Sequence, residues 1–224
     1  MIPFRNLAET LTPDGSRVSV HEHDGEYFLK LNSRQLMSST STSSELLLAD
    51  KACAHLHDRA KARVLIGGLG LGFSLKRVLE MIGPAGVVQV AELLPEVVTW
   101  NRELLAGVNG RLLDDSRVEV FVADVFTLIR RGAKAPYDAI LLDVDNGPTS
   151  FVQKKNSRLY DWRGLKLISN ALKPGGRVAF WAAEAEPGFC DELSRAGFAT
   201  EEYPAKAHAR AKRFAHIIYV GERT

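Results

Sequence analysis

The sequence has only two cysteines, no long apolar run and almost no net charge. Cys53 and Cys190 lie far apart in the 224 residues and form no C-x-x-C pair, which argues against a zinc site or disulfide framework and is consistent with a reducing compartment. No apolar run reaches the ~20 residues of a membrane-spanning helix, and residues 1–11 carry charges without the apolar core of a signal peptide. We therefore expect a cytoplasmic protein with no membrane partner.

The charge balance and the missing motifs exclude several kinds of activity. The 29 basic and 27 acidic residues give a formal net charge of +2, too small to indicate a nucleic-acid or membrane partner by itself. No Ser-His-Asp set and no metal-spaced histidines or paired cysteines are present, so a hydrolase or metalloenzyme is not indicated and no metal is expected. The absence of a G-x-x-x-x-G-K-[ST] loop argues against a nucleoside triphosphate.

The most informative feature is a glycine-rich junction between an apolar run and a helical pattern. The run at residues 63–67 is followed by Gly68, Gly70 and Gly72, and a helix-like pattern extends over residues 71–82. Glycines at such a turn let the backbone approach a ligand without Cβ atoms in the way. A strand, a tight glycine turn and a helix in this order are typical of α/β sheets that bind nucleosides.

An acidic residue at the end of the next apolar run narrows the range of possible ligands. Residues 87–91 end on Glu92, 20 residues after Gly72 (92 − 72), and a carboxylate there can accept both ribose hydroxyls. Phe73 stands where a dinucleotide fingerprint has its last glycine. We therefore expect a nucleoside without a long phosphate tail, for which S-adenosylmethionine fits best. The alternative is a glycine turn that merely packs a helix on a strand.

The N-terminal residues predict a small β-structure. Residues 17–23 and 26–31 alternate in polarity around Asp24-Gly25, a strong tight-turn pair. This pattern predicts a β-hairpin, with a third strand near residues 34–37.

From residue 63 onward, strand and helix patterns alternate. Strands are predicted near 63–67, 87–91, 117–122, 138–142 and 176–181, and helices near 71–82, 95–106, 125–131, 161–172 and 188–196. Such alternation predicts a parallel sheet with helices on both faces. Residues 199–203 and 215–220 are separated by too few residues for a helical crossover and should pair antiparallel. We predict an α/β, Rossmann-like fold with a mostly parallel seven-stranded sheet and an antiparallel last strand. Residues 1–42 would form a β-hairpin extension and 43–224 the catalytic domain.

Five motifs carry a resemblance to a known family. They are the glycines at 67–72, Glu92 at a strand end, Asp124-Val125 after the third strand, Tyr137 to Asp143 along the fourth strand, and the turn at 172–176. Together they make the chain resemble the class I S-adenosylmethionine-dependent methyltransferase fold. Within it, the chain is similar to the spermidine synthase-like branch, which includes the polyamine aminopropyltransferases. The resemblance covers roughly residues 45–220 and is more specific for the fold than for the reaction.

The resemblance implies roles for individual residues around the cofactor. Gly68, Gly70 and Gly72 would line its methionine part, and Glu92 would bind the ribose diol. The adenine would be held by a hydrogen bond from its amino group to the Asp124 carboxylate and by the backbone N–H of Val125. Asp124 has a second interpretation as the N-cap of the helix that follows.

The end of the fourth strand would carry the chemistry. Asp143 would face the reactive end of the cofactor and, with Asp145, orient the nucleophile and take its proton. Aminopropyltransferases typically have Asp-Ser-Ser-Asp here, and in this chain Asn146 replaces the second Asp. Because an amide cannot act as a base, we expect a methyltransferase of the spermidine synthase-like group, acting on an amine or hydroxyl acceptor. Asp145 or Glu26 could compensate for the lost acid. An aminopropyltransferase using decarboxylated S-adenosylmethionine and a non-catalytic nucleoside-binding module are the alternatives.

Several further positions allow more than one interpretation of how the chain binds its substrate and partners. Residues 145–161 would either cover the substrate or form a solvated connection, and Trp181 would either face the sulfonium or pack in the core. The acceptor is expected to be a small molecule. The basic segment 206–213 would attract an anion such as RNA, although a solvated loop is the favoured interpretation. The exposed hairpin edge could pair with a second copy, which leaves a homodimer open.

Overall fold

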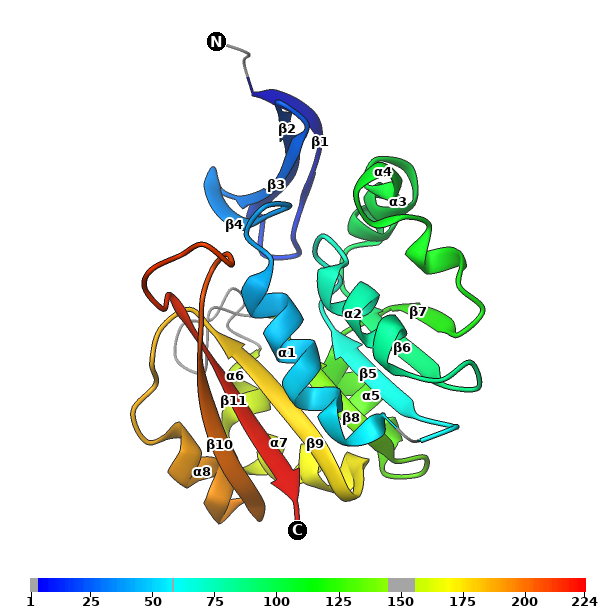
Figure 1. Cartoon of the computed structure of the whole chain (residues 1–224), viewed down its shortest axis with the longest axis vertical. Helices are drawn as coiled ribbons and strands as arrows, with labels where there is room; N and C mark the ends of the chain where they lie inside the picture. Colours follow the sequence, from blue (N-terminus) through cyan, green and yellow to red (C-terminus); the bar gives the residue numbers. More distant parts are fainter. Residues whose placement is uncertain (1–3, 58, 145–155) are drawn as a thin grey trace.

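The computed structural model describes residues 4–57, 59–144 and 156–224. It contains a small antiparallel sheet above a larger α/β body (Figure 1). The small sheet has the order β1 (Arg5–Leu11), β2 (Arg17–His23), β3 (Glu26–Leu31), β4 (Arg34–Ser38). The predicted hairpin is β2 and β3, and the predicted third strand is β4. Strand β1 was not predicted, because a register shift between Asn6 and Ala8 interrupts its alternation.

The larger sheet confirms the predicted fold class. Its strands are β5 (Arg63–Gly67), β6 (Val87–Glu92), β7 (Val118–Val122), β8 (Tyr137–Leu142), β9 (Leu172–Ala182), β10 (Phe198–Ala205) and β11 (His216–Arg223). They lie in the order β10-β11-β9-β8-β5-β6-β7. Strands β5 to β9 pair in parallel, and β11 is antiparallel to both of its neighbours.

Helices cover both faces of this sheet and enclose two apolar cores. They are α1 (Ser43–Cys53), α2 (Phe73–Met81), α3 (Pro95–Glu103), α4 (Ala106–Asn109), α5 (Val125–Gly132), α6 (Ser157–Tyr160), α7 (Trp162–Ala171) and α8 (Phe189–Arg195), with 3-10 turns η1 (Ala54–Leu56) and η2 (Leu112–Asp114). Helices α1, α2 and α3 pack in one core and α5, α7 and α8 in the other (Figure 1). In the described residues, no helix combines the length and apolarity needed to span a bilayer.

Strand order places a crevice beside β5. The chain runs from β5 outward through β6 to β7, then returns to β8 on the other side of β5. Ligands of open α/β sheets bind where the strand order reverses in this way, beyond the carboxyl ends of the strands. The N–H of Asp143 donates to the carbonyl of Gly67 at 3.1 Å. This bond holds the ends of β5 and β8 together and positions both beside the crevice.

A buried carboxylate stabilises the opposite end of β8. All six residues of β8 are buried, and among them Asp138 has no exposed surface. Its carboxylate accepts hydrogen bonds from Lys173 at 2.7 Å and from the backbone N–H of Arg63 at 2.8 Å, and it pairs with Arg59. Burial would raise the pKa of Asp138, but these donors and cations together lower it. Asp138 therefore stays ionised and joins β8 to β5 and β9.

Replacing Asp138 with Ala should lower the free energy of unfolding by about 2–3 kcal/mol, because the Arg63 N–H loses its buried acceptor. Its cationic partners are partly exposed and can turn to water. Urea unfolding measures the loss. The matched control is Asp50→Ala, which removes a partly exposed ion pair with Arg77 and should cost less than about 1 kcal/mol. Equal losses in the two variants would contradict this account.

Candidate functional site

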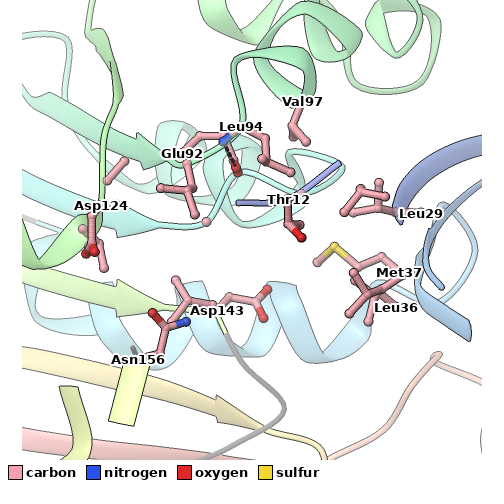
Figure 2. Close-up of a pocket in the computed structure, with 18 of the residues that line it drawn as sticks. Thr12, Leu29, Leu36, Met37, Glu92, Leu94, Val97, Asp124, Asp143 and Asn156 are labelled. Carbon is pink, nitrogen blue, oxygen red and sulfur yellow. Dashed lines mark hydrogen bonds between the residues drawn. The ribbon is translucent and has the colours of Figure 1, made fainter. Parts of the chain in front are cut away.

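A pocket occupies the crevice, between the large sheet and the N-terminal sheet (Figure 2). Its lining comes from the glycine turn after β5, the ends of β6 and β8, the residues after β7, helix α1 and strands of the small sheet. Residues as far apart in the sequence as Thr12 and Trp181 therefore share one cavity.

The glycine turn needs glycine for steric reasons. The φ angles of Gly68, Gly70 and Gly72 are +88°, +51° and +87°, a region that other residues rarely adopt. A Cβ on Gly68 would lie 2.4 Å from the carbonyl oxygen of Asp143, and one on Gly70 would lie 2.5 Å from Sδ of Met37. Gly68 and Gly70 line the pocket, whereas Gly72 precedes α2 and lies outside the lining.

Glu92 clasps this turn from the end of β6. Its side chain is buried and lines the pocket. One carboxylate oxygen accepts from the backbone N–H of Leu69 and the other from that of Leu94, each at 2.9 Å (Figure 2 draws the Leu94 bond). Burial raises the pKa of Glu92, although the backbone donors oppose the shift. Each oxygen keeps a lone pair, so the carboxylate can also accept from a ligand.

Asp124 has the structural role that the capping interpretation predicted. Its Oδ1 accepts from the backbone N–H of Phe126 at 2.9 Å and so caps α5. Its Oδ2 pairs with Arg158, whose guanidinium lies 4.4 Å from the centre of the Phe126 ring. Both Asp124 and the buried Val125 line the pocket. The cap and a ligand-binding role are therefore compatible.

Asp143 and Glu45 form the acidic centre of the pocket. Asp143 follows β8, and its carboxylate points into the cavity (Figure 2). Burial, reinforced by the negative charge of Glu45, raises the pKa of Asp143 to about 7. Burial likewise raises the pKa of Glu45, which is 5% exposed and accepts from the Ser44 hydroxyl at 2.6 Å. A carboxyl group with a pKa near neutrality is suited to exchange a proton with a substrate.

Sequence reasoning missed Glu45. It stands in the first turn of α1, where an acidic residue is ordinary because it favours the helix dipole. Nothing in the sequence pattern indicates that this residue is buried. Asp145 and most of the 145–161 segment lie outside the described residues, while Asn156 and Trp181 both line the pocket. The Trp181 ring lies 4.7 Å from the ring of His216.

The described lining of the pocket is acidic and contains no cation, although Arg158 pairs with Asp124 from outside the lining. Its lining includes the carboxylates of Glu45, Glu92, Asp124 and Asp143, and no Lys, Arg or His. Such a cavity favours positively charged ligands. No group of three or more His, Cys, Asp or Glu side chains in the described part of the chain is arranged to hold a metal ion.

Comparison with known families identifies this arrangement. The family model of the spermine/spermidine synthase domain matches residues 44–187. The chain belongs to this family. A polyamine aminopropyltransferase of Mycobacterium tuberculosis is 34% identical over 127 residues, 56% of this chain and 23% of that protein. Polyamine aminopropyltransferase 1 of Hyperthermus butylicus is 31% identical over 116 residues, 51% of this chain and 38% of that protein.

Solved structures agree with the fold. The spermidine synthase of Thermotoga maritima has a TM-score of 0.76 at 19% identity, and the match covers 98% of this chain and 73% of that chain. At this identity the likeness concerns the fold. The match to the two curated relatives named above spans less than half of their length.

These findings correct the expected methyltransferase, which is wrong: the family and the curated relatives are those of aminopropyltransferases. The spermidine synthase-like branch and the Rossmann-like fold of the resemblance are supported. The physical reason for the error lies in the substituted motif at the end of β8. The loss of one acid at Asn146 outweighed the family likeness, while the buried acid at Glu45 could not be seen.

Replacing Gly68 with Ala should destabilise the protein by more than about 2 kcal/mol, because the new Cβ needs a strained φ and collides with backbone. The matched control is Gly107→Ala in α4, where no atom lies within 4 Å of a new Cβ. That variant should unfold at the same or a slightly higher urea concentration. Comparable stability of the two variants would refute the tight packing of the turn.

Proposed function

We propose that this chain transfers the aminopropyl group of decarboxylated S-adenosylmethionine to an amine acceptor. The observation that carries the proposal is the charge of the pocket, which has four carboxylates and no cation among its described lining residues. Family membership supports the same conclusion.

The charge of the pocket discriminates between the two forms of the co-substrate. S-adenosylmethionine ends in a carboxylate and an ammonium, and its carboxylate would meet Glu45 or Asp143 without a basic partner from the described lining. Like charges in a poorly solvated site repel strongly. The decarboxylated form ends in an ammonium alone, which these carboxylates attract.

We assign the nucleoside to the half of the pocket nearest β6 and β7. There Glu92 would accept the ribose hydroxyls while holding the glycine turn through its backbone bonds. Asp124 and Val125 would bind the adenine at the start of α5. Gly68 and Gly70 would allow the chain to approach the sulfonium end.

We assign the transfer step to Asp143. The co-substrate supplies a carbon activated by its attached sulfonium, and the acceptor nitrogen forms its bond to that carbon as the carbon–sulfur bond breaks. The electron pair remains on sulfur, which leaves neutral methylthioadenosine. The excess proton on the acceptor nitrogen passes to Asp143, which its raised pKa allows. Glu45 would hold the ammonium group of the co-substrate beside Asp143 and so align the reactants.

Changing Glu92 to Ala should weaken methylthioadenosine binding at least about tenfold, because the ribose loses its acceptor and the turn loses two backbone bonds. Calorimetry measures the affinity. Glu103→Ala, at the exposed end of α3, is the control and should bind as the unchanged protein does. Undiminished affinity in the Glu92 variant would refute the assigned ribose site.

The pH dependence of turnover should report Asp143. Because the group must be ionised to accept a proton, kcat/KM should rise as pH increases through about 7. Glu45→Gln removes a negative neighbour, so the midpoint should move to lower pH, and Glu103→Gln should leave it in place. Asp143→Asn should lower kcat by about 100-fold or more. If the midpoint of the pH profile does not move in Glu45→Gln, another group controls the profile, such as the acceptor amine itself.

A further inference from the structure

The N-terminal sheet gives the pocket an apolar wall. Val18, Leu29, Leu31, Leu36 and Met37 form it, and Thr12 stands at its edge. In Figure 2 the labelled members of this wall lie on the right, Asp124 lies on the left, and Asp143 lies between them. The acidic centre therefore has the nucleoside half on one side and the apolar wall on the other.

A β-bulge in β4 adds to the apolar wall. Leu29 pairs with Met37 and Lys30 pairs with Gln35, so Leu36 is an extra residue without a partner in the ladder. Successive residues of a regular strand point to opposite faces, whereas a bulge re-aims one of them. Leu36 and Met37 consequently both line the pocket, although they are adjacent in sequence.

The apolar wall offers no charge to a second ammonium group. Its one polar side chain, Thr12, is neutral, and its hydroxyl is directed at the carbonyl of Ser16, 3.0 Å away, and at the Asp14 carboxylate. Strand alternation places Glu26 on the face of β3 opposite to Leu29 and Leu31, because it lies an odd number of positions before each of them. Glu26 does not line the pocket.

Among the described lining residues, the number of carboxylates limits the number of ammonium groups that can be paired. The aminopropyl end of the co-substrate and the attacking amine bring two nitrogens to the acidic centre, where Glu45 and Asp143 can face them. A diamine acceptor would bring a third, which would lie against the apolar wall. Burying an unpaired ammonium is strongly unfavourable, whereas a hydrocarbon group gains by leaving water there.

We propose that the preferred acceptor is a primary monoamine that carries an apolar group, aliphatic or aromatic, rather than a diamine. The inference rests on the proposed aminopropyl transfer and specifies its acceptor. The amine nitrogen lies at Asp143 and the apolar group against Leu29, Leu36 and Met37. The bonds made and broken, and the transfer of the proton to Asp143, are those of the step described above.

Matched acceptors test this specificity directly. Hexylamine and 1,6-diaminohexane have the same carbon chain and differ by one amino group, as do butylamine and 1,4-diaminobutane. With decarboxylated S-adenosylmethionine, methylthioadenosine release should give a kcat/KM at least about tenfold higher for each monoamine. Calorimetry on the protein saturated with methylthioadenosine should show the same order of affinities, which tests acceptor binding without turnover.

A charge placed in the apolar wall should reverse the preference. Leu36→Glu supplies a carboxylate for the second ammonium and should favour the diamine of each pair. Leu36→Gln, which is polar but neutral, should weaken monoamine binding without favouring the diamine. Gln35→Glu adds the same charge at the exposed neighbouring position of β4 and should keep the original order. Urea unfolding of each variant confirms that the sheet is intact.

The outcomes separate the two proposals. Release of methylthioadenosine with diamines preferred to monoamines would overturn the monoamine inference and leave aminopropyl transfer standing. Binding of monoamines in the calorimeter without release from any acceptor would support the apolar site and refute the proposed reaction. Equal affinity for both members of each pair, with no response to Leu36→Glu, would refute the role of the apolar wall.

Discussion

The site depends on one buried carboxylate that holds the glycine turn in place. Glu92 accepts hydrogen bonds from the backbone N–H of Leu69 in the turn and from that of Leu94 after β6. A buried charge needs such donors, because it has given up the water that would otherwise solvate it. The glycine turn in return needs an anchor, because glycine loses more conformational freedom on folding than any other residue. Each feature stabilises the other, and the crevice beside β5 results.

The acids of the pocket differ in what neutralises them. Glu92 has backbone donors, and Asp124 has Arg158 and the start of α5. Glu45 has only the hydroxyl of Ser44 among its described side-chain partners, and the influences on Asp143 are burial and Glu45 itself. The first two acids are therefore held as fixed parts of the framework by partners within the protein. In the proposed reaction, positive charge from the ligand would balance the other two.

Local sequence signals identified residues that line the half of the pocket nearest β6 and β7. A glycine turn, an acid at a strand end and an N-cap aspartate are each defined by a few neighbouring residues, so Gly68, Glu92 and Asp124 could be found without a structure. The predicted strands and helices of the larger sheet occur within a few residues of their expected positions, except that 95–106 divides into α3 and α4.

The other half of the pocket depends on packing that the sequence does not display. Glu45 is buried because α1 packs across β8 and β9, which lie about a hundred residues further along the chain. Leu36 faces the cavity because of a bulge, and the alternating sequence pattern does not predict a bulge there. The weight given to Asn146 was misplaced for the same reason: acids that act together can come from distant segments.

The family match includes one half of the pocket and leaves out the other. The match begins at residue 44 and so includes the glycine turn, Glu92 and Asp143 but excludes the whole apolar wall. In the proposed reaction, the nucleoside would have to be held in one geometry for displacement at its activated carbon, which would constrain those residues closely. The acceptor has only to bring a nitrogen to Asp143, and the rest of it can vary with the surface it contacts. If the proposed reaction holds, a small sheet packed over the nucleoside site could change the acceptor while leaving the chemistry unchanged, and the close approach of Met37 to Gly70 joins the two parts.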